Sequence, residues 1–142
     1  MECTVRWMGN DAGMSFVAET GSGHAVVMDG APEAGGRNLG PRPMEMVLAG
    51  TGGCSAFDVV LILKKGRHAV SSCDVTLKAE RADSDPKVFT HIHLHYRVKG
   101  KQLKPDAVAR AIALSKEKYC SASIMLAETA SITHDFEIIE EA

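Results

Sequence analysis

The sequence has no surplus of charge of one sign, no long hydrophobic run and no dense set of cysteines. Its 16 Lys and Arg nearly balance its 18 Asp and Glu, which gives a net charge of -2. A chain without a surplus of basic residues lacks the positively charged surface with which proteins bind phosphate backbones or anionic lipid. Nucleic acid is therefore not expected as a partner.

No segment has the pattern of a membrane span or an export signal. The longest wholly apolar run covers residues 59–63, whereas about 20 apolar residues are needed to cross a bilayer. The first seven residues contain no basic segment that leads into an apolar core, as a secretory signal does. These features predict a cytoplasmic protein that does not interact with membranes.

The cysteines are too few for a disulfide scaffold, and no two of them are spaced as C-x-x-C. Any disulfide is therefore expected to form transiently during chemistry rather than to support the fold. Cys3 and Cys73 fall on the apolar faces of expected strands, which predicts that they are packing residues. The remaining two, Cys54 and Cys120, lie in helical segments.

The chain of 142 residues has the usual size of one domain, and its content of 45% hydrophobic and 24% charged residues is ordinary for a soluble globular protein. Residues 1–142 are therefore expected to form a single domain. Apolar and polar residues alternate as they do in strands. The three alternating segments at this end of the chain are residues 3–7, 14–18 and 24–28. A loop rich in glycine and proline, residues 30–43, follows with room for function.

A long helix is predicted for residues 43–65. Pro43 suits its first turn, Glu45 complements the helix dipole there, and Gly66 can end it. Residues 59–63 are apolar all round, which predicts that this helix is buried on every side. Further strands are expected at 73–79, 92–98 and 132–139, with a broken helix from 105 to 126 before the last. This order of elements predicts an α+β fold.

The glycines beside Cys54 are costly, because each glycine in a helix interior costs about 1 kcal/mol relative to alanine. One interpretation is packing, in which a stripe of small residues lets a second helix approach closely and Cys54 is a small core residue. The other is that the glycines open space beside a reactive sulfur. Spacing alone favours packing. The stripe consists of Ala49, Gly50, Gly53 and Ala56.

Cys120 lies where the last helical segment is expected to break. If Cys120 begins the second piece, backbone amides and the helix dipole should lower the pKa of its thiol. The alternative is an inert cysteine under a loop. Cys54 and Cys120 can act as attacking and resolving thiols only if the fold brings them together.

Three histidines at strand spacing raise the possibility of a metal site, because neutral imidazoles bind zinc, copper or nickel. They are His91, His93 and His95. The residues between them are apolar and form the expected core side of the strand, which leaves the histidines facing solvent. We therefore expect no metal there. No phosphate-binding glycine motif and no nucleophilic serine motif occurs elsewhere.

Two segments resemble the OsmC/Ohr family of bacterial stress-linked proteins, and within it the YhfA-type branch. They are GPRPMEMVLAGTGGCSAFDVV at residues 40–60 and EKYCS at 117–121. The segments FTHIHLH at 89–95 and ITH at 132–134 are also in the style of that branch, and the resemblance covers nearly the whole chain. It implies an OsmC-like fold in an intertwined homodimer whose central helices lie between sheets.

For function, the resemblance implies a thiol-dependent reductase of organic hydroperoxides that takes part in oxidative stress defence and needs no metal or organic cofactor. The helix cysteine of the family, here Cys54, attacks the peroxide, and the later one, Cys120, resolves it as a disulfide that an external dithiol reduces. The alternative is a non-catalytic dimer that binds a small molecule or senses redox state.

The resemblance also implies a glutamate directly after the helix-starting proline and an arginine that stabilises the thiolate. In this chain Met44 follows the proline, and Glu45 stands one step further, about 100° around the helix. Glu45 is the expected catalytic carboxylate. Arg37 and Arg42 are the candidates for the arginine. The displaced glutamate predicts slower peroxide turnover than in the dedicated reductases of the family.

Overall fold

The computed structural model describes all residues, 1–142, and the chain forms two compact units, Met1–Val47 and Leu48–Ala142. The order of strands and helices along the chain confirms the predicted α+β class. The expectation that residues 1–142 form a single domain stays a prediction.

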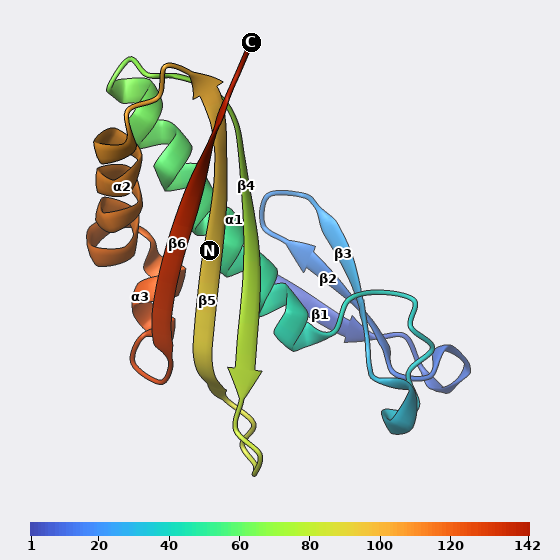
Figure 1. Ribbon diagram of the computed structural model, residues 1–142. Helices are drawn as coiled ribbons and strands as arrows, with labels where there is room; N and C mark the ends of the chain where they lie inside the picture. Colours follow the sequence, from blue (N-terminus) through green and yellow to red (C-terminus); the bar gives the residue numbers. More distant parts are fainter. The chain divides into compact units, whose positions relative to one another are not determined.

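The first unit is built on a three-stranded antiparallel sheet in the order β1-β2-β3 (Figure 1). The strands are β1 (Cys3–Trp7), β2 (Ser15–Thr20) and β3 (Ala25–Asp29). β1 is exposed along its whole length, so the prediction that Cys3 is a packing residue is wrong within this unit. The alternation of the sequence indicated which residues share a face of the strand, but not whether anything covers that face.

The loop after β3 is held by one buried carboxylate, that of Asp29. It accepts hydrogen bonds from the backbone N–H groups of Gly30 at 2.8 Å, Arg37 at 3.0 Å and Leu39 at 3.1 Å. These bonds, the one from Leu39 first, lower the pKa of Asp29 below its ordinary value, although burial opposes them. Asp29 thereby fixes the course of the loop that carries Arg37.

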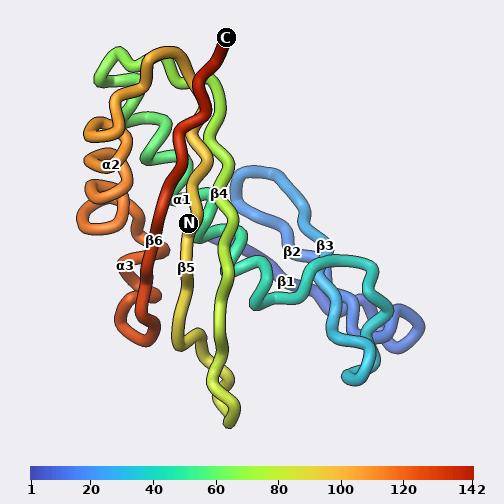
Figure 2. The backbone as a smooth tube through the Cα atoms, viewed as in Figure 1, coloured from blue at the N-terminus to red at the C-terminus, as the bar shows by residue number.

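The second unit holds a three-stranded sheet in the order β4-β5-β6. The strands are β4 (Ala69–Arg81), β5 (Phe89–Lys101) and β6 (Ser131–Glu140). β4 and β5 pair antiparallel. β6 lies parallel to β5, and a parallel pair needs a crossover connection. Figure 2 shows this crossover as the helical path between β5 and β6.

The crossover consists of α2 (Pro105–Leu114), one turn of π-helix, η3 (Ser115–Tyr119), and α3 (Ser121–Leu126). This confirms the predicted break in the helix near Cys120. A π-turn changes the direction of the chain within a helical run and is frequent at functional sites. Here it separates two helices of different axis and leaves Cys120 at the junction.

The long helix α1 (Pro43–Lys65) has the predicted bounds. It lies against the β4-β5-β6 sheet (Figure 1), and Gly52 is the point of close approach. A Cβ atom at Gly52 would lie 2.5 Å from Cδ1 of Leu77 on β4, so any larger residue there requires the end of the Leu77 side chain to move. The core beneath α1 is formed by apolar side chains of the helix, the sheet and α2. They include Val59, Leu63, Ile92, Leu94, Val98, Val108 and Ile112.

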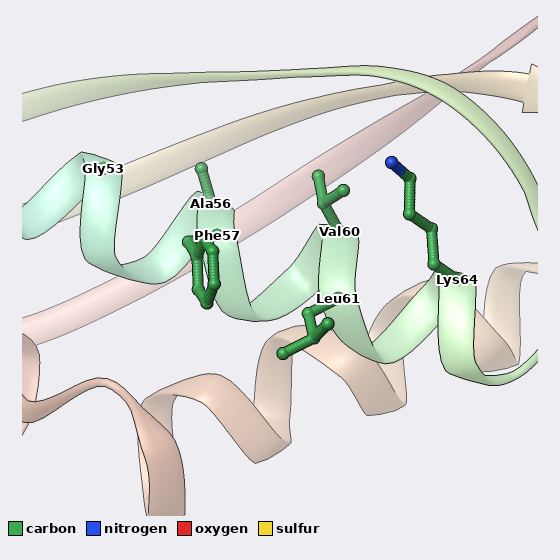
Figure 3. A pocket seen from close by; sticks show the side chains of 6 residues that line it. All are labelled: Gly53, Ala56, Phe57, Val60, Leu61 and Lys64. Atoms are coloured by element: carbon green, nitrogen blue, oxygen red, sulfur yellow. The ribbon is translucent and has the colours of Figure 1, made fainter.

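Within the single chain α1 is not buried on every side, so the predicted burial on every side would require cover from a second copy. Only the stripe that faces the sheet is buried, while Phe57 is 67% exposed and Leu61 is 38% exposed. A single sheet covers one stripe of a helix, so a helix that is apolar all round keeps a second apolar face in one chain. Figure 3 shows the side chains of this second face. They line a groove of about 390 Å³ and are Gly53, Ala56, Phe57, Val60, Leu61 and Lys64.

α1 is also long and apolar enough, by length and composition alone, to cross a membrane. The core helix of a soluble protein meets the same criterion. In this chain one side of α1 packs on the sheet through Gly52, Val59 and Leu63.

Candidate thiol site

The candidate site lies entirely in the second unit and combines α1 with the junction between η3 and α3. Cys54 and Asp58 are four residues apart on α1, a spacing that places both side chains on one face of the helix. Cys120, which is 66 positions after Cys54 in the sequence, lies at the junction. The two sulfurs and a carboxylate oxygen of Asp58 all lie within 4.8 Å of one another. The fold thus brings Cys54 and Cys120 together, which sequence spacing alone did not show.

The π-turn holds Cys120 in place. The backbone N–H of Cys120 donates to the carbonyl of Ser115 at 2.8 Å, and Cys120 is the N-cap residue of α3. Its sulfur accepts a hydrogen bond from the backbone N–H of Ser123 at 3.4 Å. Its thiol group lies 4.0 Å from the carbonyl oxygen of Thr51 on α1. The Cys120 thiol is therefore held between α3, through Ser123, and α1, through Thr51.

The pKa of the Cys120 thiol is raised, which corrects the expectation that the helix start would lower it. Cys120 is 0% exposed, and burial is the largest cause of the shift. Hydrogen bonds from Ser123 do favour the thiolate, as the sequence argument assumed, but they are outweighed by the loss of solvation. The neighbouring Cys54 adds to the rise.

Asp58 is anchored by a chain of buried hydroxyl groups. The Tyr96 hydroxyl lies 2.6 Å from that of Ser55, which lies 3.0 Å from that of Ser115, and Ser115 donates to Oδ2 of Asp58 at 3.2 Å. An ionised carboxylate only accepts, and each hydroxyl donates once, so the chain runs from Tyr96 to Asp58. Burial raises the pKa of Tyr96 to about 12, which keeps its proton in place at neutral pH.

The two thiols differ in access. Cys54 is half-buried, whereas Cys120 is fully buried. A cleft of about 280 Å³ opens on the surface beside the site and reaches it at Asp58. The other residues that line this cleft are Leu61, Ile62, Lys65, Leu114 and Tyr119. A small reagent can therefore approach Asp58 from this side, and of the two site cysteines only Cys54 is partly exposed to solvent.

The other residues expected at the site lie in the first unit. Glu45 accepts a hydrogen bond from the backbone N–H of Arg42 at 2.8 Å, and its other oxygen lies 3.6 Å from the Arg42 guanidinium. Glu45 thus satisfies a free N–H at the start of α1, as the third residue of a helix often does. The backbone N–H of Arg37 is bound to Asp29. The roles of Glu45, Arg37 and Arg42 toward Cys54 stay predictions.

Sequence reasoning missed Asp58. The signal was present, since Asp58 is the only charged residue between Glu45 and Lys64 on α1, and it stands one helical turn after Cys54. A carboxylate within an apolar helix, on the same face as a cysteine, indicates a polar site inside the core. Ser115 and Tyr96 gave no such signal, because their meeting with Asp58 depends on tertiary structure.

The histidine triplet lies on the face of β5 opposite the core, as predicted. Ile92, Leu94 and Tyr96, each of which follows one of these histidines, are buried on the core side of β5. His95 binds Asp135 on β6 at 2.6 Å, and this bond is the main cause of the lowered pKa of Asp135. That the triplet holds no metal stays a prediction.

The chain matches a known family. The model of the OsmC-like protein family matches residues 35–135, and the chain belongs to this family.

The relatives are bacterial. The chain is 49% identical to protein YhfA of Escherichia coli K12 over 139 residues, which cover 98% of both chains. A hypothetical protein from Aquifex aeolicus has a similar crystal structure, with a TM-score of 0.83, 29% identity and coverage of 99% of this chain and 97% of that chain. An organic hydroperoxide resistance protein from Elizabethkingia anophelis has the same fold, with a TM-score of 0.66 at 16% identity, covering 96% of this chain and 94% of that one.

Proposed function

We propose that the protein is a thiol-dependent reductase of organic hydroperoxides, with Cys54 as the peroxidatic thiol and Cys120 as the resolving thiol. The observation that carries the proposal is the placement of two sulfurs within 4.8 Å, one of them half-exposed and the other fully buried. Membership of the OsmC-like family supports it, as does the shared fold with a protein named for organic hydroperoxide resistance. The role is defence against oxidative stress in the cytoplasm.

The reaction has two steps at sulfur. The Cys54 thiolate attacks the terminal oxygen of the hydroperoxide, the O–O bond breaks, and the alcohol leaves, which gives a sulfenic acid on Cys54. The thiol of Cys120 then attacks the Cys54 sulfur, and the disulfide forms as water leaves. An external dithiol restores both thiols. No metal or organic cofactor takes part in these steps.

The environment of each sulfur supports this order of attack. Cys120 is fully buried and its pKa is raised, so it stays a thiol and is shielded from a reagent in solution. Cys54 is the sulfur that a peroxide can reach. Asp58 lies within 4.8 Å of both sulfurs and is placed to accept the proton that each thiol gives up.

The cleft beside Asp58 suits a small organic hydroperoxide. Its walls are mainly apolar, from Leu61, Ile62 and Leu114, with Lys65 and Tyr119 also present. An apolar wall favours an alkyl or aryl substituent on the peroxide over hydrogen peroxide itself. The substrate class is therefore organic hydroperoxides. We also assign Glu45 as the catalytic carboxylate, and Arg37 or Arg42 as the arginine that stabilises the Cys54 thiolate.

We also propose that the protein acts as a homodimer. The exposed face of α1 presents Phe57 and Leu61 beside Gly53, which leaves room for a second helix to approach. Gly50 and Gly53 have no atom within 4 Å of a Cβ built on them, so nothing in the same chain fills the space along the small-residue stripe. A second copy of α1 offers the same surface, as a symmetric dimer requires.

Peroxide consumption with cumene hydroperoxide and dithiothreitol tests the proposal. The wild type should turn over, Cys54→Ser should abolish consumption, and Cys120→Ser should react once and stop at the sulfenic acid or beyond. Cys73→Ser is the matched control, because Cys73 is half-buried as Cys54 is but lies on β4. Loss of activity in Cys73→Ser with full activity in Cys54→Ser would refute the assignment.

A second function, a dimer that senses redox state or binds a small molecule without turnover, is favoured by one observation. Glu45, the nearest match to the catalytic glutamate of the family, already caps the backbone N–H of Arg42. Under this alternative one equivalent of peroxide forms the Cys54–Cys120 disulfide. External dithiols then reduce this disulfide too slowly for peroxide consumption to continue. Multiple turnovers distinguish the reductase from the sensor.

A further inference from the structure

We propose that the reduced thiol site binds a zinc ion through the sulfurs of Cys54 and Cys120 and the carboxylate of Asp58. All three donor atoms lie within 4.8 Å of one another. With Zn–S bonds of about 2.3 Å and Zn–O bonds of about 2.0 Å, the donors of a tetrahedral site lie roughly 3.5–3.8 Å apart. Small rotations of the side chains therefore bring the three donors to bonding distance around one ion.

The backbone is suited to hold these donors. Cys54 and Asp58 stand at positions i and i+4 of α1, the spacing at which two side chains of one helix bind the same zinc ion. Cys120 supplies the third donor from the other side, and its sulfur is held near α1 by Ser123 and Thr51. Two donors from a rigid helix and one from a fixed junction require little rearrangement on binding.

No cation of the chain occupies the site, because none of the three residues forms an ion pair with a lysine or arginine. Metal binding displaces the protons of both thiols, so a bound ion would be held by two thiolates and a carboxylate. The donor set excludes magnesium and calcium, which prefer oxygen ligands only, and favours a metal that binds thiolate.

The surroundings of Asp58 are those of a metal ligand. Its carboxylate accepts a hydrogen bond from Ser115, which continues through Ser55 to Tyr96. Hydrogen bonds of this kind orient ligating carboxylates. Three protein donors leave the fourth tetrahedral position for water, so the ion remains exchangeable.

Zinc and peroxide are then competitors for the same sulfurs. Bound zinc occupies both thiolates and protects Cys54 from oxidation, whereas the Cys54–Cys120 disulfide leaves no thiolate to bind metal. The inference concerns metal binding by the reduced thiols, and it does not depend on peroxide turnover.

Cobalt(II) added to the reduced, metal-free full chain is the direct probe, because thiolate ligation gives it an intense sulfur-to-metal absorption band. One equivalent should produce this band, and one equivalent of zinc should remove it. Cys54→Ser and Cys120→Ser should lose it, and Asp58→Asn should weaken binding by about 10-fold or more. Circular dichroism of each variant verifies that it is folded.

Two controls make the result specific. Cys73→Ser and His93→Ala should bind cobalt as the wild type does, since Cys73 lies on β4 and His93 on the opposite face of the sheet. Protein oxidised to the disulfide should not bind. Folded, reduced protein that shows no band overturns the proposal, and so does binding that Asp58→Asn leaves unchanged. A protein that binds cobalt but consumes no peroxide supports this inference and refutes the reductase.

Discussion

Replacing Phe57 by alanine should weaken the proposed homodimer strongly. Phe57 lies on the outer face of α1, where 67% of it is exposed in the single chain (Figure 3). In a symmetric dimer built on this face, each partner buries its own Phe57 against the other. The substitution therefore removes two aromatic contacts from one interface while leaving the stripe that faces the sheet untouched.

The size of the effect follows from the exposed area. Full burial of a phenylalanine side chain stabilises by about 1.5–3 kcal/mol. Because 67% of Phe57 remains to be buried, two copies contribute about 2–4 kcal/mol. Since 1.4 kcal/mol corresponds to a factor of ten, the Kd of the dimer should rise by about 30-fold to 10³-fold. A dimer stable at micromolar concentration in the wild type would dissociate largely or wholly in Phe57→Ala.

Sedimentation velocity over a range of micromolar concentrations measures this directly. Met125→Ala is the matched control, since Met125 is also 67% exposed but lies on α3, and it should sediment as the wild type does. A wild-type chain that sediments as a monomer throughout the range refutes the reasoning. So does a Phe57→Ala dimer of unchanged Kd.

Three further predictions concern stability and the histidines. Leu63→Ala, at a side chain that is 1% exposed, should lower the free energy of unfolding by about 2–5 kcal/mol in urea titrations. Asp29→Asn should make residues 30–42 more susceptible to proteolysis. Because the pKa of Asp29 is lowered in the folded chain, its contribution to stability is present above its ordinary value of 3.8. That contribution disappears as the pH falls through the lowered value, so wild type and Asp29→Asn should converge in urea titrations in acid. His93→Ala should leave peroxide turnover unchanged. Metal analysis of untagged protein should give the same metal content for the wild type and His93→Ala, because the triplet is expected to hold no metal.

Local sequence signals account for most of the second unit. Pro43 and Gly66 marked the bounds of α1 correctly, because proline suits the first turn of a helix and glycine its end. The alternation around Ile92 and Leu94 identified the core face of β5 correctly, because the side-chain period of a strand is two residues. Such signals depend only on neighbouring residues.

The parts that could not be predicted depend on contacts between distant segments. The sequence placed Cys54 and Cys120 on helices, but their approach results from the crossover that returns β6 parallel to β5. The raised pKa of Cys120 depends on how deeply the junction is buried, which its helix-start position does not indicate. The apolar character of α1 was evident, but not which of its faces the single sheet leaves exposed.

The central claim is that Cys54 and Cys120 form a catalytic pair, and mass spectrometry of the reduced protein treated with one equivalent of cumene hydroperoxide tests it most directly. The account predicts a loss of two hydrogen atoms in mass and a single peptide pair linked through Cys54 and Cys120. Dithiothreitol should then restore the original mass, and the cycle should repeat. Folded protein in which both thiols remain reduced after prolonged exposure would contradict the account.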